Sequence, residues 1–300
     1  SNSSDPMKYP VYQPSLSGNE KRYVNEALDS TWISSRGPFV ERFERMVAET
    51  AGVDFAIAVS NGTVALHVAL LAIGVGPGDT VIVPNLTYVA PANAVSYCGA
   101  NVRLVDVNRS TWNIAEHEIR RAMDESVKAV ITTDLYGLPC YLSQTLRDDL
   151  ASSGVIVVED AAEAIGSSYD SIPAGSLGEI GVFSFFGNKT ITTGEGGMVV
   201  TNTPSYEPLI RMLKNQGVSN SSTYFHEMLG YNYRMTNIQA AIGVAQMERL
   251  TEIIERKQQI EQWYRDKLSD HVRFQGVPEA ANTNAWLVSV ILPDVINRET

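Results

Sequence analysis

The sequence is poor in the residues that build metal centres and disulfide frameworks. Its 300 residues include two cysteines, Cys98 and Cys140, and four scattered histidines. None of these recurs at the spacing typical of zinc or redox sites, so we expect no metal site. Runs of uncharged apolar residues are too short to span a bilayer, and the first residues do not resemble a signal peptide. We therefore expect a cytoplasmic protein with no membrane segment.

Basic residues are also few. The chain has 23 lysines and arginines against 34 aspartates and glutamates, which gives a formal net charge of −11. This balance argues against a general affinity for nucleic acids or anionic membranes, although local amides and one or two arginines can still hold a small anion. Because 44% of the residues are hydrophobic, the chain can bury a full core in one large or two smaller domains.

Strand-like and helix-like patterns alternate along most of the chain. The predicted strands cover residues 55–60, 81–84, 102–107, 129–135, 155–161, 181–186 and 197–202. Helical patterns lie between the first five of them, near residues 63–73, 90–97, 115–124 and 143–152. This alternation predicts an α/β fold with a largely parallel sheet covered on both faces. Only a short loop joins the last two strands, so we expect a seven-stranded sheet with one reversed member.

Capping patterns indicate where the flanking helices begin. Ser17 and Glu20 form a capping box that is predicted to open a helix, and residues 38–51 follow as a second helix. A second box, Thr236 with Gln239, is predicted to open a long helical region. Residues 286–292 are predicted as a strand with little to pair against.

The positions of these elements suggest a division into domains. We expect a large ligand-binding domain over residues 1–245, including the N-terminal helices. Residues 246–300 are expected to be the start of a smaller C-terminal domain that is incomplete.

The stretch 182–198 combines an apolar, aromatic strand with a glycine-rich loop, and Lys189 lies at the start of that loop. A lysine that is partly desolvated there has a lowered pKa and can act as a nucleophile. Considered alone, Lys189 is more simply a solvated loop residue. Ser184, earlier on the strand, suits either a bond to a neighbouring carbonyl or a bond to a phosphate oxygen.

Other polar groups also follow strands, and the carboxyl ends of parallel strands are the usual place for a ligand. Residues 60–63 end one strand and open a helix, where Gly62 and free amides suit either a phosphate or a plain helix cap. Asp160 ends another strand and needs a positive partner, which is either an arginine or a protonated ring nitrogen. Tyr88 suits stacking on a flat ring or a place in the core.

An amine, a carboxylate, an aromatic ring and a phosphate cradle are together the set that pyridoxal phosphate requires. The lysine bonds to this cofactor, and the carboxylate keeps its ring nitrogen protonated. A glycine-rich run at 74–78 precedes a strand instead of following one, so it is not predicted to be a dinucleotide loop. The residues alone therefore predict a pyridoxal phosphate enzyme.

Five segments resemble one known family, the DegT/DnrJ/EryC1/StrS sugar-nucleotide aminotransferases, which have the aspartate aminotransferase fold, or fold type I. The segments are residues 32–35, 60–66, 159–166, 184–197 and 231–243, and the resemblance extends over about residues 11–292. The third and fourth segments are highly specific for the family. Residues 186–192, Phe-Gly-Asn-Lys-Thr-Ile-Thr, resemble a branch that aminates a GDP-linked 4-keto-6-deoxy sugar with L-glutamate as donor.

The resemblance implies a role for each residue near the cofactor ring. Lys189 binds the cofactor covalently and moves a proton between cofactor and sugar carbon. Asp160 pairs with the ring nitrogen, Glu163 approaches the ring hydroxyl, and Tyr88 stacks on the ring. One departure stands out, because Asp134 and Leu138 occupy positions where the family usually carries a histidine and a glutamine.

The resemblance also implies contacts to the phosphate and the partner subunit. Gly62, Thr63 and Ser184 hold the phosphate. Asn232 reaches the phosphate in the neighbouring subunit, which implies a homodimer with shared active sites. The candidate contacts to the nucleotide-sugar substrate are Trp32, Ser34 and Ser35.

Three other functions stay open at this point. Another nucleotide-sugar 3- or 4-aminotransferase would share the same chemistry. A sugar 3-dehydratase on this fold carries histidine in place of the lysine, and Lys189 argues against it. A ligand-binding or regulatory protein without turnover would be marked by the loss of that lysine.

Overall fold

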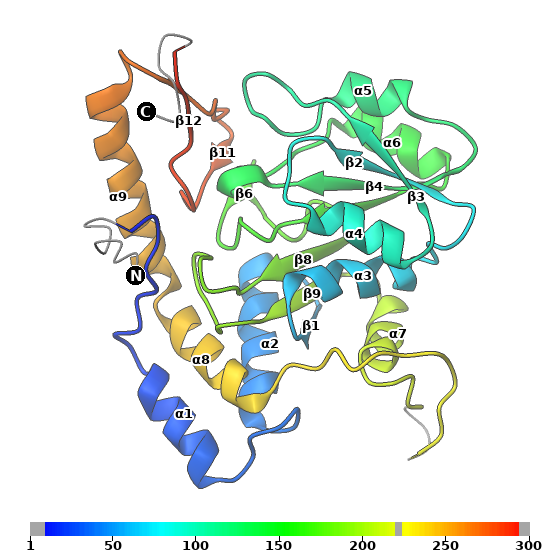
Figure 1. Cartoon of the computed structure of the whole chain (residues 1–300), viewed down its shortest axis with the longest axis vertical. Coiled ribbons are helices and arrows are strands. Elements are labelled where there is room, and N and C mark those ends of the chain that lie inside the picture. Colours follow the sequence, from blue (N-terminus) through cyan, green and yellow to red (C-terminus); the bar gives the residue numbers. More distant parts are fainter. Residues whose placement is uncertain (1–9, 220–223, 294–300) are drawn as a thin grey trace, which may run out of the picture.

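A seven-stranded sheet forms the centre of the computed structural model, which describes residues 10–219 and 224–293 (Figure 1). The strand order is β1-β9-β8-β5-β4-β2-β3. The strands are β1 (Phe55–Val59), β2 (Thr80–Pro84), β3 (Asn101–Val105), β4 (Val127–Thr133), β5 (Ile156–Asp160), β8 (Ile180–Ser184) and β9 (Gly197–Thr201). All seven predicted strands are therefore present, within two residues at each end.

One strand of this sheet runs against the others. β9 is antiparallel to both β1 and β8, whereas the pairs β2–β3, β2–β4, β4–β5 and β5–β8 are parallel. The loop between β8 and β9 is too short for a crossover helix, and it closes with a bond from the Phe185 amide to the Gly196 carbonyl at 2.8 Å. The predicted α/β fold with a seven-stranded, mostly parallel sheet and one reversed member is confirmed.

Helices cover both faces of the sheet (Figure 1). They are α1 (Glu20–Asp29), α2 (Pro38–Ala51), α3 (Gly62–Ala72), α4 (Ala90–Tyr97), α5 (Glu116–Arg121), α6 (Gln144–Ser152), α7 (Tyr206–Leu213), α8 (Asn237–Glu248) and α9 (Leu250–Leu268). Each face has its own core. Ile57 of β1 packs among residues of α3, α4 and α7, whereas its neighbours Ala56 and Ala58 pack among residues of α1, α2 and α8. This burial on both faces explains why the strands are apolar without a gap.

Short strands connect the remaining segments. β6 (Ser168–Tyr169), β7 (Ile172–Pro173) and β11 (Ala281–Asn282) form a three-stranded sheet, and β10 (Arg273–Phe274) pairs with β12 (Val290–Ile291). The strand predicted over residues 286–292 is wrong in length, because only the two residues of β12 pair. The backbone amide of Trp286, the first residue of that range, does not pair with a strand but donates to the Asn284 side chain, at 3.0 Å from Oδ1.

The capping prediction for α1 is wrong, and the one for α8 is confirmed. Asn19, not Ser17, precedes α1, and its side chain donates to Glu248 Oε2 at 2.8 Å instead of capping the helix. The residues that resembled a cap therefore attach α1 to α8. In α8 the Thr236 hydroxyl and the Gln239 side chain form the predicted reciprocal capping box.

The predicted domain boundary at 245/246 falls inside α8, which packs against α1 and α2. The division into a large and a small domain therefore stays a prediction. In the described part of the chain no helix has the length and apolar character needed to cross a membrane.

Replacing Phe43 should test the packing of α2 on the sheet. Phe43 is fully buried, and its ring centroid lies 4.9 Å from that of Phe185. A Cβ on Gly243 of α8 would lie only 2.7 Å from the Phe43 ring, so the helices meet tightly there. Phe43→Ala should lower the free energy of unfolding by about 3–5 kcal/mol in chemical denaturation. Arg45→Ala, on the exposed face of α2, should change it by less than about 0.5 kcal/mol; similar losses would contradict this assignment.

Candidate active site

A cavity of about 690 Å³ opens where the strands end. Its walls come from the segments that follow β1, β2, β5 and β8, as expected for the carboxyl edge of a parallel sheet. Seven of the eight predicted cofactor-binding residues line this cavity: Gly62, Thr63, Tyr88, Asp160, Glu163, Ser184 and Lys189. Segments far apart in the sequence are thus brought together as predicted, although contact with a cofactor itself stays a prediction.

The first turn of α3 and the end of β8 form one end of the cavity. Asn61 caps α3, because its Oδ1 accepts a hydrogen bond from the Val64 amide at 3.0 Å. A Cβ on Gly62 would lie 2.8 Å from the Ser184 Cβ, so only glycine allows this close approach. The helix N-terminus and the Ser184 hydroxyl therefore face the same space, which is the arrangement that suits a phosphate.

Two buried carboxyl groups lie at the centre of the cavity. Burial raises the pKa of Asp160 to about 6, against the opposing effects of the Ala162 amide and the Lys189 charge. Burial also raises the pKa of Glu163 to about 7, again opposed by Lys189. Glu163 Oε2 accepts a hydrogen bond from the Tyr136 amide at 2.6 Å, which fixes the direction of its carboxyl group. Glu163 can therefore hold or release a proton near neutral pH.

Lys189 reaches into the cavity between a carboxylate and an aromatic ring. Its Nζ lies 3.7 Å from Glu163 Oε1 and 4.3 Å from the centroid of the Trp286 ring. Its side chain is only 14% exposed. A turn closed by the Lys189 amide and the Phe186 carbonyl, at 3.0 Å, holds the backbone just beyond β8. The lysine is therefore partly desolvated, and its role as a nucleophile stays a prediction.

Three residues of the site were missed by the sequence analysis: Tyr136, Asn284 and Trp286. Tyr136 adopts a left-handed backbone conformation with φ 58°, which aims its amide at Glu163. Asn284 is fully buried and donates to the carbonyls of Glu163 and Ile165 at 2.9 and 3.0 Å. The Asn284 contacts join segments more than 100 residues apart and the Tyr136 contact spans 27 residues, so no local pattern identifies them. In the structure Tyr136 and Gly137 both have positive φ, and the Tyr-Gly pair itself is the only trace of this turn in the sequence of the described residues.

The remaining predicted site residues lie away from this cavity in a single chain. Trp32 and Ser35 line a separate cavity of about 560 Å³, and the Ser34 carbonyl accepts a hydrogen bond from the Asn237 amide at 2.6 Å. Asn232 is exposed, and its Oδ1 accepts hydrogen bonds from Nε and Nη2 of Arg234. Their roles toward substrate and cofactor stay predictions.

The two departures from the family pattern are buried and do not line the cavity. Asp134 and Leu138 are at most 1% exposed. Asp134 Oδ1 accepts a hydrogen bond from the Cys140 amide at 2.8 Å. Burial, together with the nearby Glu159 carboxylate, holds the pKa of Asp134 well above its ordinary value. Asp134 is joined to the site through its backbone, because its amide donates to the Asp160 carbonyl at 3.0 Å.

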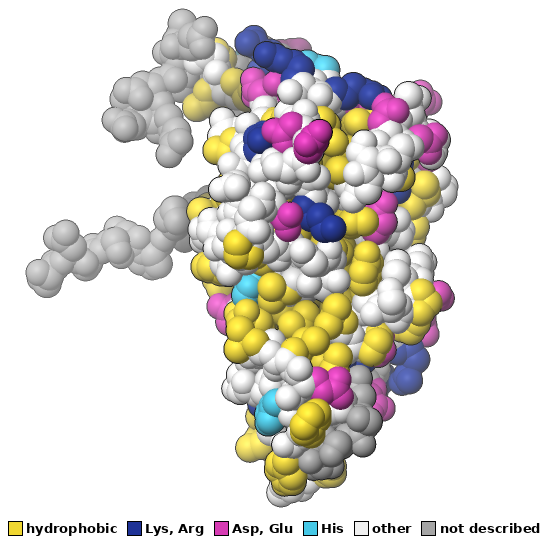
Figure 2. All heavy atoms as spheres, turned by 90° about the vertical axis from the view of Figure 1, so that its right-hand side faces the viewer, with side chains coloured by type: hydrophobic (Ala, Val, Ile, Leu, Met, Phe, Trp, Pro, Cys, Tyr) yellow, Lys and Arg dark blue, Asp and Glu magenta, His cyan; other side chains and the backbone are white. Residues whose placement is uncertain are grey.

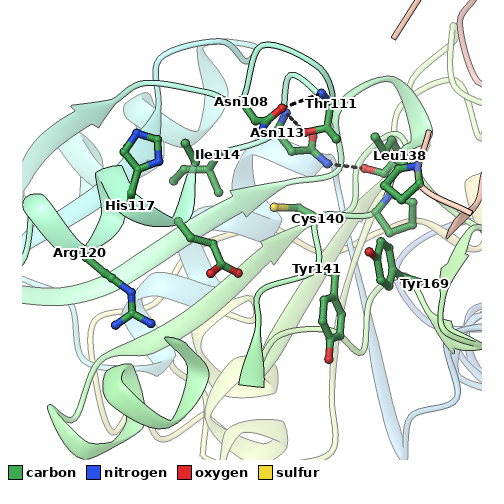
Figure 3. A pocket seen from close by; sticks show the side chains of 14 residues that line it. Asn108, Thr111, Asn113, Ile114, His117, Arg120, Leu138, Cys140, Tyr141 and Tyr169 are labelled. Atoms are coloured by element: carbon green, nitrogen blue, oxygen red, sulfur yellow. Dashed lines mark hydrogen bonds between the residues drawn. The ribbon is translucent and has the colours of Figure 1, made fainter. Parts of the chain in front are cut away.

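A different cavity, of about 480 Å³, lies beside α5 (Figure 3). Its polar groups are largely occupied, because Asn113 donates to the Leu138 carbonyl and Asn108 accepts from the amides of Ser110 and Thr111. No lysine lines it. Among the described residues no group of three or more histidine, cysteine, aspartate or glutamate side chains is arranged to hold a metal ion.

Comparison with known proteins gives the class of the chain. The model of the DegT/DnrJ/EryC1/StrS aminotransferase family matches residues 14–299. The GDP-perosamine synthase of Escherichia coli O157:H7 is 48% identical over 98% of this chain and 80% of its own length. The enzyme of the same name from Vibrio cholerae is 45% identical over 94% of this chain and 77% of its own length.

Solved structures agree with this result. A protein of Streptococcus pneumoniae has been solved in a PMP form and a PLP form. Its PMP form superposes on this chain with a TM-score of 0.89 at 26% identity, covering 95% of this chain and 78% of that one. The aminotransferase from Psychrobacter cryohalolentis gives 0.86 at 30% identity, over 97% and 80%. The chain therefore belongs to the DegT/DnrJ/EryC1/StrS aminotransferase family, and it has the fold that the sequence predicted.

The raised pKa of Glu163 makes a prediction about stability. A carboxyl group whose pKa is about 7 in the folded protein and about 4.5 unfolded destabilises the fold progressively as the pH rises between these values. Glu163→Gln removes that penalty, so the apoprotein variant should gain in melting temperature over the wild type from pH 5 to pH 7.5. Glu49→Gln, on the exposed face of α2, should give a curve parallel to wild type. A difference between Glu163→Gln and wild type that does not grow with pH would contradict the burial argument.

Proposed function

We propose that the protein is a pyridoxal 5'-phosphate-dependent aminotransferase that transfers the amino group of L-glutamate to a 4-keto-6-deoxy sugar nucleotide. The substrate that we propose is GDP-4-keto-6-deoxymannose, with GDP-perosamine as the product. One observation carries the proposal: Lys189, the buried Asp160 and the first turn of α3 converge on one cavity. The similarity to two GDP-perosamine synthases supports the choice of nucleotide and sugar.

The residues of the cavity fit this cofactor. The first turn of α3 and Ser184 would hold the phosphate, because the missing Cβ of Gly62 brings them within reach of the same oxygens. Asp160, which is buried and feels the positive charge of Lys189, would pair with the ring nitrogen. Tyr88 is 72% exposed at the cavity wall and would cover the ring. When bound, pyridoxal phosphate supplies an electron sink for the substrate carbon that loses its proton.

The protein's own groups would handle the protons. Lys189 Nζ would accept the proton that the amino donor's carbon loses in the first half of the reaction, since its amine lies inside the cavity. In the second half, Lys189 would deliver a proton to the sugar carbon. Asp160 would stay negatively charged when paired with the ring nitrogen, because a positive partner lowers the pKa of a buried carboxyl group. Glu163 would hold a proton at its Oε1 or share it with Lys189, 3.7 Å away. Trp286, 6% exposed, would exclude water from the amine.

The proposal includes a homodimer whose active sites are shared. Exposed apolar side chains gather beside the cavity, namely Leu86, Tyr88, Val89 and Tyr97, and Figure 2 shows hydrophobic side chains in a band across one face. A surface of this kind is usually covered by another subunit. Asn232 is exposed and lies outside the cavity of its own chain, which fits a role in the partner's site.

The function can be tested with a panel of substrates. The protein, L-glutamate and pyridoxal phosphate should convert GDP-4-keto-6-deoxymannose to an amino sugar, detected by mass spectrometry, faster than UDP- or dTDP-linked 4-keto sugars or any 3-keto sugar. Lys189→Ala should lower the rate by at least about 10⁴-fold, because both the covalent link and the proton carrier are lost. Preference for another nucleotide or for a 3-keto sugar would replace the proposed substrate and leave the cofactor chemistry intact.

A covalent label gives the matched control. Borohydride reduction of the cofactor-loaded protein should fix the cofactor on Lys189. Lys214 is the appropriate comparison, because it is also buried and its pKa is lowered by burial to about 8, yet it lines a different cavity and donates to the Ala58 carbonyl. A label on Lys214, or on no lysine, would refute the assignment of the cofactor site.

Shared sites can be tested by mixing two inactive variants. Lys189→Ala removes the amine, and Asn232→Ala removes the group expected to reach the partner's phosphate. In a heterodimer one site would carry both defects and the other neither, so activity should return to about one quarter of wild type after equal mixing and subunit exchange. Heterodimers that form without any return of activity would show that Asn232 serves its own chain.

A further inference from the structure

Lys189 is held by a cluster that contains residues from three separate segments. This lysine-binding cluster consists of Tyr136, Glu163 and Trp286. Glu163 Oε1 and the Trp286 ring approach the amine at 3.7 and 4.3 Å. The Tyr136 ring stacks on Trp286 with 6.4 Å between centroids and 26° between planes, while its amide donates to Glu163. Tyr136 thus contacts both of the residues that approach the lysine amine.

Trp286 is fixed in place more firmly than a surface aromatic residue would be. Its indole Nε1 donates to the Asn188 carbonyl at 2.7 Å, directly before Lys189 in the chain. Its amide donates to Asn284 Oδ1 at 3.0 Å, and Asn284 also donates to Thr190 Oγ1 at 3.2 Å, directly after Lys189. Both neighbours of the lysine are therefore bonded to the segment that carries Trp286. The position of the indole face and that of the lysine backbone are set together.

The contacts of the amine are favourable for an ammonium group but do not hold it in one direction. A cation over an aromatic face is attracted without the angular requirement of a hydrogen bond. An ion pair at 3.7 Å is likewise longer than a hydrogen bond. A lysine that alternately bonds to a cofactor and carries protons needs such a site, because it has to stay close to the reacting carbon and remain free to move.

We infer that Trp286 is a positioning residue whose indole face holds the Lys189 ammonium group whenever the amine is not bonded to the cofactor. Glu163 supplies the balancing negative charge. Tyr136 fixes the position of the indole ring relative to the carboxyl group, because it contacts both. The inference rests on the proposed function, in which Lys189 is the reactive amine. It adds a residue from the segment after α9, which the sequence analysis did not connect with the chemistry.

The charged groups around Lys189 decide how the inference is tested. Asp160, at the end of β5, and Glu163, just after it, both interact with its charge, and Lys257 of α9 lines a second cavity together with Lys189. Removing the large Trp286 ring would also admit water, and hydration favours the ammonium form, so a comparison with wild type mixes two effects. Trp286→Phe and Trp286→Leu differ mainly in the aromatic face, because both side chains are smaller than tryptophan and both lack the indole N–H. The comparison between these two variants is therefore the informative one.

The measurement follows the titration of Lys189 in the full-length apoprotein. Trace acetylation with acetic anhydride over pH 6–10, quantified by peptide mass spectrometry, gives the pH at which Lys189 becomes reactive, with the exposed Lys267 as internal reference. Trp286→Phe should titrate about one pH unit above Trp286→Leu, a tenfold difference in proton affinity. Accessibility alone would change the amplitude of labelling and leave the midpoint the same.

Equal midpoints in the two variants would overturn the inference and leave the proposed function standing. Trp286→Tyr and Trp286→Met form a second pair with the same contrast, so a failure of one variant to fold still leaves a decisive comparison. Folding of each variant is checked by thermal unfolding. Borohydride labelling of a different lysine would instead refute the proposed function, so the two failures can be told apart.

Discussion

The carboxyl groups of Asp160 and Glu163 both face the largely buried amine of Lys189 at the edge of the sheet. The site therefore has more acidic groups than basic groups, and its electrostatics depend on that difference. Asp160 and Glu163 are both withdrawn from water, and among the described residues Lys189 is the one lysine that lines their cavity. Burying a carboxylate without a positive partner is costly, which is why both pKa values are raised. A protonated ring nitrogen would supply the second positive charge. The proposed cofactor would therefore balance the charges of the site.

A third carboxyl group shows how the sheet tolerates such burial. Glu159, next to Asp160, is fully buried and accepts hydrogen bonds from the amides of Gly175, Leu177 and Gly178. Because side chains alternate along a strand, Glu159 points to the opposite face of β5 from Asp160. One carboxyl group is therefore satisfied by backbone amides and supports the loop at 175–178, while its neighbour faces the cavity. Of these two adjacent acidic residues, Glu159 stabilises a loop on one face of the sheet and Asp160 lines the cavity on the other.

The sequence was informative where a local pattern determines the structure. Uninterrupted apolar strands, the short β8–β9 link and the Thr236 capping box each depend on a few adjacent residues, and these predictions are confirmed. Gly62, Asp160 and Lys189 could be found because each lies at or just beyond the end of a strand, and parallel strands bring their ends together. The prediction for Ser17 was wrong because α8 supplies partners for the neighbouring polar residues that a cap would otherwise have used.

The residues that escaped prediction depend on contacts between distant segments. Asn284 and Trp286 lie in an irregular stretch, and only the folded chain shows that they bond to both sides of Lys189. A similar link joins the proposed phosphate end of the cavity to the segment that carries Asn232. The Ser60 amide donates to the Tyr233 carbonyl at 2.8 Å, and the Tyr233 hydroxyl lies 3.2 Å from Nδ1 of His67 on α3. Since α3 also carries Gly62 at its first turn, one helix sets both the position of the cavity's end and that of the segment proposed to reach the partner. A displacement of α3 would therefore disturb both proposed sites of a dimer, the one in its own chain and the one across the interface.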